Sequence, residues 1–325
     1  MLARHAENLF WTGRYIERAE DTARLLDVTY HTLVEASPFE ARRTWRDLLI
    51  VLTLETAFDE TGREPTAREV SEFLVLDTTQ PGSIVSSVTH ARENVRSLRE
   101  QVSTELWEAV NGFHLDMLAR DLQADLDQPH TLYASVKRRC QLLAGVAAET
   151  MPRDDGWRFL QIGWMLERAE MSCRSLAVRL AQASTGADAY HHWLGILKAA
   201  SGAEAYRKAH RASIEPADVV EFLLLSRNFP RSLLFCVRRV EQELGRLGTS
   251  DGRLTRPERL LGRLRADLEY ADLHEVTGDV DGQELHVFLE RMQTGIRQIA
   301  EAVALQYFRN SHEVGLTVLD FHPTG

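Results

Sequence analysis

Apolar residues recur at three- and four-residue spacing along almost the whole chain. This spacing gathers them on one face of an α-helix, which has about 3.6 residues per turn. We find no convincing run of strict two-residue alternation flanked by hairpin turns, so strands are not expected. Pro, Gly and Asp clusters interrupt the pattern, for example at 59–66, 125–130 and 248–257. The pattern therefore predicts an all-α fold of roughly a dozen helices, several of them longer than a typical globular helix.

The helical pattern repeats itself within the chain. The stretch "GRYIERAEDTARLL" at 13–26 agrees with "GWMLERAEMSCRSL" at 163–176 in seven of fourteen positions. A second block at 70–88 agrees with 219–237 in eight positions at nearly the same offset, and three identities lie between the two blocks. Ordinary composition would give roughly one identity per block. The chain is therefore predicted to be a tandem duplication.

The two predicted halves, 1–150 and 151–325, are expected to pack as one unit. Each would be a helical bundle of about 150 residues, with the two first helices close to a local two-fold axis. The alternative is two separate domains joined by a linker. The junction, however, carries Trp157 and Phe159 and no long flexible segment, which favours a continuous unit.

The best-preserved repeat carries a polar stripe. In the first half, i, i+4, i+7, i+11 spacing places four residues within about 60° on a helical wheel: Gly13, Glu17, Glu20 and Arg24. Apolar residues such as Ile16 and Ala23 run beside them, so the stripe is expected at the margin of the inward face. The second half repeats the stripe with Gly163, Glu167, Glu170 and Arg174. We expect Arg18 and Arg168 to point away from the apolar arc or toward a neighbouring helix.

A structural interpretation explains the stripe by ion pairing. Glu20 with Arg24, and likewise Glu170 with Arg174, have the i, i+4 spacing of an intrahelical ion pair. Glu17 and Glu167 would accept hydrogen bonds from arginines or helix ends in the other half. A glycine inside each helix would permit close approach of another backbone.

A functional interpretation stays open beside it. The four glutamates could converge on a divalent cation, although the Glu-x-x-His pattern of di-iron bundles is absent and all-oxygen ligation would favour magnesium, manganese or calcium. They could instead accept a cationic or peptide-like ligand, with Arg14, whose counterpart is Trp164, marking an asymmetry. The candidates for binding a ligand or a partner are Glu17, Glu20, Glu167, Glu170, Arg14, Arg18, Arg24, Arg168 and Arg174. We assign no catalytic residue and no metal-ligating residue.

Two loop-to-helix turns form a second candidate site. Ser83 and Ser232 stand where an N-cap is expected, and the helix that follows would present free backbone N–H groups. Arg227 and Arg231 add positive charge to the second turn alone. An anion such as phosphate or a carboxylate could bind there, although ordinary helix capping is the favoured explanation of the serines.

Charge and composition narrow the classes of function. The formal net charge of −10 argues against nucleic acid as a partner, in spite of short basic stretches. The longest apolar run, 48–54, is too short to span a bilayer, and the charged first thirty residues contain no signal-peptide core, so no membrane association is expected and the protein is expected to be cytoplasmic. Cys140, Cys173 and Cys236 lie far apart and are interpreted as buried apolar residues.

No motif for a catalytic centre or a cofactor stands out. Phosphate-binding, dinucleotide-binding, nucleophile-elbow and zinc-protease signatures are all absent, and we expect no cofactor. The twelve histidines are scattered, and His191–His192 is the one adjacent pair. We interpret that pair as the start of a helix rather than as a metal site.

The same residues resemble a known family. "AENLFWTGRYIERAEDTARLLDV" and "RDDGWRFLQIGWMLERAEMSCRSL" look like the bacterial alpha-E domain proteins, a former domain of unknown function, and so do the stretches at 73–111 and 221–240. The resemblance covers essentially the whole chain. It implies a helical protein named for its glutamates, which fall here on Glu17, Glu20, Glu167 and Glu170.

The resemblance also implies a functional setting. Family members occur beside, or fused to, circularly permuted ATP-grasp proteins, often near a transglutaminase-like protease and a proteasome-like peptidase. The leading hypothesis is accordingly a helical accessory or co-catalytic partner of an ATP-grasp-type amide ligase in peptide synthesis or in protein or peptide modification. The alternatives are an enzyme whose paired carboxylates bind a divalent metal and a purely structural interaction module. Whether the chain is itself an enzyme is left open.

Overall fold

The computed structural model of the chain describes residues 1–33, 37–180, 187–210, 214–248, 252–272 and 283–308. Every regular element in these ranges is an α-helix, which confirms the predicted fold class. The described ranges contain fifteen helices rather than a dozen. The excess arises from helices of one or two turns, which are too short to show a hydrophobic period.

The helices of residues 1–150 are α1 (Ala3–Thr32), α2 (Pro38–Leu52), α3 (Glu55–Asp59), α4 (Ala67–Val75), α5 (Ile84–Arg96), α6 (Thr104–Ala119), α7 (Leu122–Asp125) and α8 (Pro129–Thr150). Those of the remaining chain are α9 (Asp155–Leu180), α10 (Ala187–Ala199), α11 (Ala203–Ala209), α12 (Pro216–Leu225), α13 (Leu233–Leu247), α14 (Arg256–Glu269) and α16 (Gln283–Tyr307).

Side-chain caps start many of these helices where the sequence offers Ser or Thr. In six helices the capping hydroxyl accepts a hydrogen bond from the backbone N–H three residues later, and the capping residues are Ser37, Thr66, Ser83, Ser103, Ser232 and Thr255. Such a cap satisfies one of the backbone donors that a helix start leaves unpaired. The predicted N-caps Ser83 and Ser232 are both confirmed.

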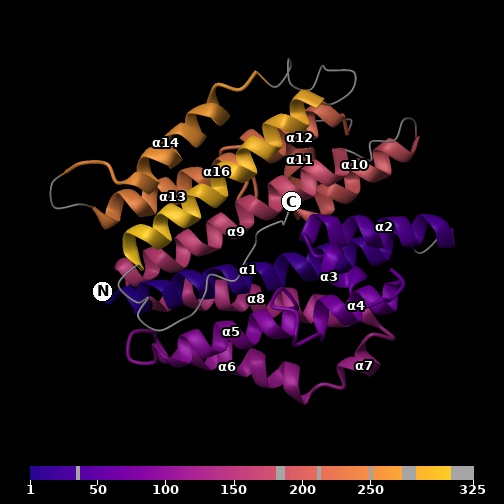
Figure 1. Cartoon of the computed structure of the whole chain (residues 1–325), viewed down its shortest axis with the longest axis horizontal. Coiled ribbons are helices and arrows are strands. Elements are labelled where there is room, and N and C mark those ends of the chain that lie inside the picture. The colour runs from indigo at the N-terminus through magenta and orange to yellow at the C-terminus, as the bar shows by residue number, and fades with distance from the viewer. Residues whose placement is uncertain (34–36, 181–186, 211–213, 249–251, 273–282, 309–325) are drawn as a thin grey trace.

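Two long helices, α1 and α9, lie side by side through the middle of the molecule (Figure 1). On one side α1 packs against α5 and α8, with α6 contacting both of these; on the other side α9 packs against α13 and α16, with α14 contacting both. Two helices also contact the opposite side, since α2 packs on α9 and α10 packs on α1. One hydrophobic core runs through the whole arrangement.

The contacts therefore have the same order in both halves, and they join the halves as the sequence led us to expect. The duplication itself and the boundaries 1–150 and 151–325 stay predictions. Residues 309–325 of the second half lie outside the described residues.

The crossing of α1 and α9 depends on two glycines in equivalent positions. A Cβ atom added to Gly13 would lie 2.2 Å from the backbone oxygen of Leu160, and one added to Gly163 would lie 2.0 Å from the backbone oxygen of Phe10. Neither position has room for a side chain. The predicted use of these glycines, close approach of two backbones, is confirmed.

Substitution at this crossing tests the packing. Gly13→Ala is expected to lower the free energy of unfolding by at least about 1–3 kcal/mol, because the methyl group meets a backbone oxygen that cannot rotate away. The matched control is Gly145→Ala in α8, where an added Cβ meets nothing within 4 Å. There the substitution should stabilise the helix by about 0.5–1 kcal/mol. Urea unfolding of both variants measures the difference, and equal effects at the two positions would contradict the proposed close approach.

Candidate functional site

The polar stripe of α1 and that of α9 face each other and form one cluster of charges. We call it the α1–α9 network. It consists of Arg14, Glu17, Arg18, Glu20, Asp21 and Arg24 on α1, Trp164, Glu167, Arg168, Glu170 and Arg174 on α9, and Arg231 in the turn before α13. All nine ligand or partner candidates named from the sequence belong to it.

Two reciprocal ion pairs cross the helix interface. Arg18 places Nε 2.6 Å from Oε1 and Nη2 3.1 Å from Oε2 of Glu167. Arg168 places Nε and Nη2 each 2.7 Å from the two carboxylate oxygens of Glu17. Both contacts are bidentate, which is the most specific geometry between a guanidinium and a carboxylate. The sequence left Arg18 and Arg168 pointing either outward or toward a neighbouring helix, and the neighbouring helix is where they reach.

Two further ion pairs stay within their own helices. Arg24 donates to Glu20 and Arg174 donates to Glu170, each at i, i+4 spacing. These are the intrahelical pairs that the spacing predicts. Each of these pairs holds the second glutamate of its stripe, Glu20 or Glu170, beside an arginine of the same helix.

The network is completed differently in its two halves. Arg14 donates through Nε to Glu167 at 2.5 Å and through Nη2 to Glu170 at 2.7 Å. The counterpart of Arg14 is Trp164, whose Nε1 donates to Glu17 but carries no charge. The missing charge is supplied from elsewhere.

Arg231 takes the place of that missing guanidinium. Its Nη1 lies 2.9 Å from Oε1 of Glu17 and also donates to Asp21, and its Nη2 lies 3.3 Å from Glu20. In the repeat alignment Arg231 stands opposite Gly82, which has no side chain. Each pair of glutamates therefore receives one extra arginine, from α1 in one case and from the turn before α13 in the other.

Burial of the network raises the cost of leaving any charge unpaired. Glu17 has no exposed surface and Glu167 is 4% exposed. Burial alone would raise the pKa of both carboxyl groups, but the adjacent arginines outweigh it and hold each pKa at about 2. For Glu17 these arginines are Arg168 and Arg231. Both glutamates are therefore ionised at neutral pH, and their stabilisation is lost only as the pH falls from about 4.5 toward 2.

Asp21 behaves in the opposite way. Burial raises the pKa of Asp21 to about 7, against the pull of Arg231 and with the help of the negative charges of Glu17 and Glu20. Its Oδ2 has no hydrogen-bond partner among the described residues, and its counterpart in the second stripe is Met171. Sequence reasoning did not single out Asp21, although its i, i+4 relation to Glu17 places it on the same stripe.

The geometry bears on the interpretations that the sequence left open. Each of the four glutamates already accepts hydrogen bonds from at least one arginine, and all four are buried. A divalent cation or a cationic ligand would have to displace these guanidinium groups inside the helix interface. Each buried charge left without its partner would cost several kcal/mol. The arrangement therefore favours the structural interpretation of the stripe.

The anion-site candidates do not come together. Ser83 and Ser232 accept hydrogen bonds from the backbone N–H groups of Ser86 and Phe235, so both hydroxyl groups are used as caps. Arg231 turns inward to the carboxylates of α1. Arg227 stays at the surface, with its side chain 65% exposed and 3.7 Å from Glu269. The buried carboxylates thus draw Arg231 away from Arg227, so the two arginines are not gathered at one place, and anion binding at this turn stays a prediction.

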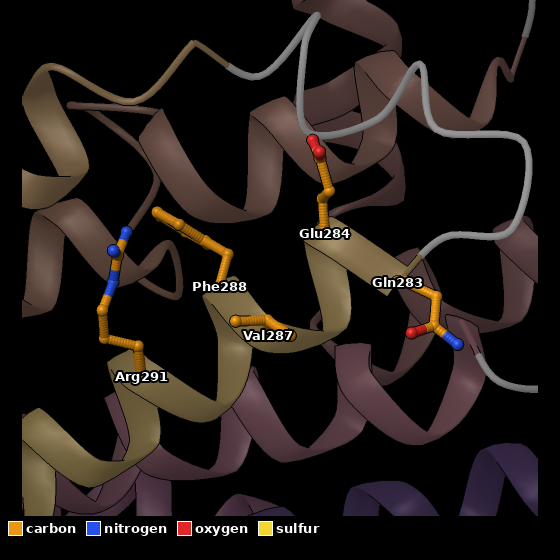
Figure 2. A pocket seen from close by; sticks show the side chains of 5 residues that line it. All are labelled: Gln283, Glu284, Val287, Phe288 and Arg291. Carbon is orange, nitrogen blue, oxygen red and sulfur yellow. The ribbon is translucent and has the colours of Figure 1, made fainter.

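A shallow pocket lies apart from the network, at the start of α16. Figure 2 shows the side chains that line it: Gln283, Glu284, Val287, Phe288 and Arg291. The guanidinium of Arg291 lies 5.4 Å from the centre of the Phe288 ring. None of the candidates named from the sequence lines this pocket.

Two other expectations concern the chain as a whole. The three cysteines are buried and none forms a disulfide, as expected. In the described part of the chain, no helix combines the length and the apolar character needed to cross a bilayer.

Comparison with known proteins identifies relatives over nearly the whole chain. The model of a family described as "a predicted alpha-helical domain with a conserved ER motif" matches residues 1–308. An uncharacterized protein of Mycobacterium bovis is 28% identical over 322 residues, and uncharacterized proteins of two Mycobacterium tuberculosis strains are 28% and 27% identical. The match covers 91% of this chain but only 36% of each relative, so the chain spans about a third of their length. No solved structure matches.

Removal of Arg231 tests the charge balance of the network. Arg231→Met leaves Glu17 and Asp21 buried beside one guanidinium fewer, which should lower the free energy of unfolding by about 3–5 kcal/mol. The control is Arg227→Met in the same turn, where an exposed side chain should matter by less than about 0.5 kcal/mol. Chemical denaturation measures both. A small effect at Arg231 would contradict the view that these carboxylates need it.

The raised pKa of Asp21 predicts an unusual pH dependence. A carboxyl group whose pKa is higher in the folded state stabilises the fold below its unfolded pKa of about 3.8, and this contribution is lost as the pH rises through about 7. Asp21→Asn should therefore compare more favourably with the unsubstituted chain at pH 7 than at pH 4. Urea unfolding of both at several pH values gives the comparison. The opposite trend would show that ionised Asp21 is required by Arg231.

Proposed function

The chain belongs to the Alpha-E family, and from this membership we propose that it is a helical accessory partner of a circularly permuted ATP-grasp-type amide ligase. The reaction served would be amide-bond formation in peptide synthesis or in protein or peptide modification, as the resemblance of the sequence to this family implies. A transglutaminase-like protease is a further partner of the same proposed system. The free, buried cysteines fit the cytoplasm as the proposed location.

The observation that carries the proposal is the closed α1–α9 network. Its two Glu-Arg pairs, Glu17–Arg18 and Glu167–Arg168, bind each other across the interface and leave neither glutamate open to a substrate. A motif used in this way fixes the relative position of two helical layers. It supports a role as a rigid body that presents its outer helices to a partner, rather than a role in chemistry at the glutamates.

The lengths of the relatives support the same role. This chain spans 36% of each mycobacterial relative, so the matching region there is one part of a longer polypeptide. A helical module that is joined to further chain in its relatives is suited to work beside another domain or protein. The carboxylate-based metal enzyme gains no support from the network, because each of its four glutamates is buried and already paired with arginine.

Co-purification tests the partnership. The tagged chain, expressed in its native host, is expected to bring down a circularly permuted ATP-grasp protein in near-stoichiometric amount. Addition of the chain to that protein should raise ATP-dependent amide formation on peptide substrates, measured as ADP release. Recovery of the tagged chain without any ATP-grasp protein would contradict the proposal.

A network variant separates docking at the outer helices from docking at the stripe. The double variant Glu17→Gln with Glu167→Gln should melt at a lower temperature, because it removes two buried carboxylates from their arginines. Below its melting temperature the double variant should still bind the ATP-grasp partner, since both side chains are buried. Loss of the partner from a folded variant would instead show that the stripe itself makes the contact.

A further inference from the structure

A second polar cluster lies farther along α1, beyond the α1–α9 network. It contains Asp27 and His31 from α1 and His130 from the start of α8. The Nδ1 atom of His130 lies 2.6 Å from Oδ1 of Asp27 and 3.0 Å from Nε2 of His31, and Nε2 of His31 lies 3.5 Å from Oδ1 of Asp27. Three potential metal donors therefore point at one small volume.

Local sequence and packing hold these donors in place. Asp27 and His31 have i, i+4 spacing, so they lie on the same face of α1. His130 follows Pro129, which occupies the first turn of α8, a position where proline is pre-organised for the helix. Since α8 packs along α1, His130 is brought against this face. The site joins two helices whose relative position the core already fixes.

Hydrogen bonds satisfy the three metal-donor atoms of this cluster poorly, because Nδ1 of His130 cannot direct one proton at both of its neighbours. One ring nitrogen of histidine carries at most one proton, which it can donate along one main direction. The Nδ1 of His130, however, has both Asp27 Oδ1 and His31 Nε2 within hydrogen-bonding distance. A cation that accepts one lone pair from each of the three atoms satisfies all of them at once.

We propose that Asp27, His31 and His130 bind a divalent first-row transition metal, with zinc as the best match. Two imidazole nitrogens and one carboxylate oxygen are ligands that zinc and its neighbours favour over magnesium or calcium. With metal–ligand bonds of about 2.1 Å, donors around tetrahedral zinc lie about 3.4 Å apart. The separations of 2.6, 3.0 and 3.5 Å need only small side-chain adjustments to reach this.

The surroundings define what kind of metal site this is. Asp27 is buried, and its other oxygen, Oδ2, accepts a hydrogen bond from Lys137, so Asp27 binds the metal through Oδ1 alone. The imidazole side chains of His31 and His130 are 54% and 55% exposed. Solvent therefore reaches the remaining coordination positions, as in zinc sites that hold an exchangeable water. The ammonium of Lys137 opposes the cation and sets a moderate affinity.

Metal titration of the full chain, with its affinity tag removed, tests this site. Zinc should bind at one equivalent with a dissociation constant on the order of micromolar, and Co²⁺ should give visible absorption bands from a four-coordinate site. His31→Ala and His130→Ala should each weaken binding by at least about tenfold. Both side chains are half-exposed, so the variants should fold, which circular dichroism checks. Magnesium should not compete.

The chain supplies a matched control for these variants. His286 and Glu290 on α16 form another exposed i, i+4 pair of histidine and carboxylate, 3.3 Å apart, that is not part of a group of three donors within the described residues. His286→Ala should leave zinc and Co²⁺ binding unchanged. Lys137→Met removes the opposing charge and should tighten binding about tenfold.

Several results would overturn the proposal. They are an unsubstituted chain that does not bind zinc, binding that survives His31→Ala or His130→Ala, an equal loss in His286→Ala, and binding that Lys137→Met leaves unchanged or weakens. The proposal is independent of the ATP-grasp partnership, since metal binding is measured on the isolated chain.

Discussion

The structure depends on one constraint: carboxylates buried between two helices must each find a guanidinium. Gly13 and Gly163 let the backbones of α1 and α9 touch, and this closeness removes Glu17 and Glu167 from water. The same closeness lets arginines of each helix reach the glutamates of the other. An isolated buried carboxylate would cost several kcal/mol, whereas a fully paired one keeps the interface intact and fixes its register. Glycine and glutamate in the repeat thus serve the same interface.

The two halves meet this constraint with different residues. One half uses Arg14 to pair both of the opposite glutamates, while the other has Trp164 in that position and draws Arg231 from a distant turn. The extra arginine thus comes from different positions relative to the two stripes, while the charge that it supplies is the same. Asp21 is the exception, since it adds a carboxylate that the second stripe lacks and gains a raised pKa as a result.

The closed network moves the question of function to the rest of the molecule. Charges that satisfy one another inside the fold are not available to a substrate, so the Glu-Arg motif is best explained as the connection between two helical layers. What remains open to solvent includes the outer helices, the shallow pocket beside α16 and the cluster of Asp27, His31 and His130. The proposed partner and the proposed metal ion would contact the protein at such surfaces, outside the α1–α9 network.

The sequence by itself determined the helical fold, because a three- to four-residue apolar period is a local property of the chain. It also determined the intrahelical pairs Glu20–Arg24 and Glu170–Arg174 and the serine caps, whose partners lie within four residues. The repeat also led us to expect that Glu17 and Glu167 pair with the other half, as they do, but it did not identify the other distant residues that meet. Arg231 reaches Glu17 across 214 positions, and His130 reaches Asp27 across 103. Only the packing of α8, α9 and the turn before α13 around α1 decided those contacts, since side-chain spacing carries information about one helix and not about which helices become neighbours.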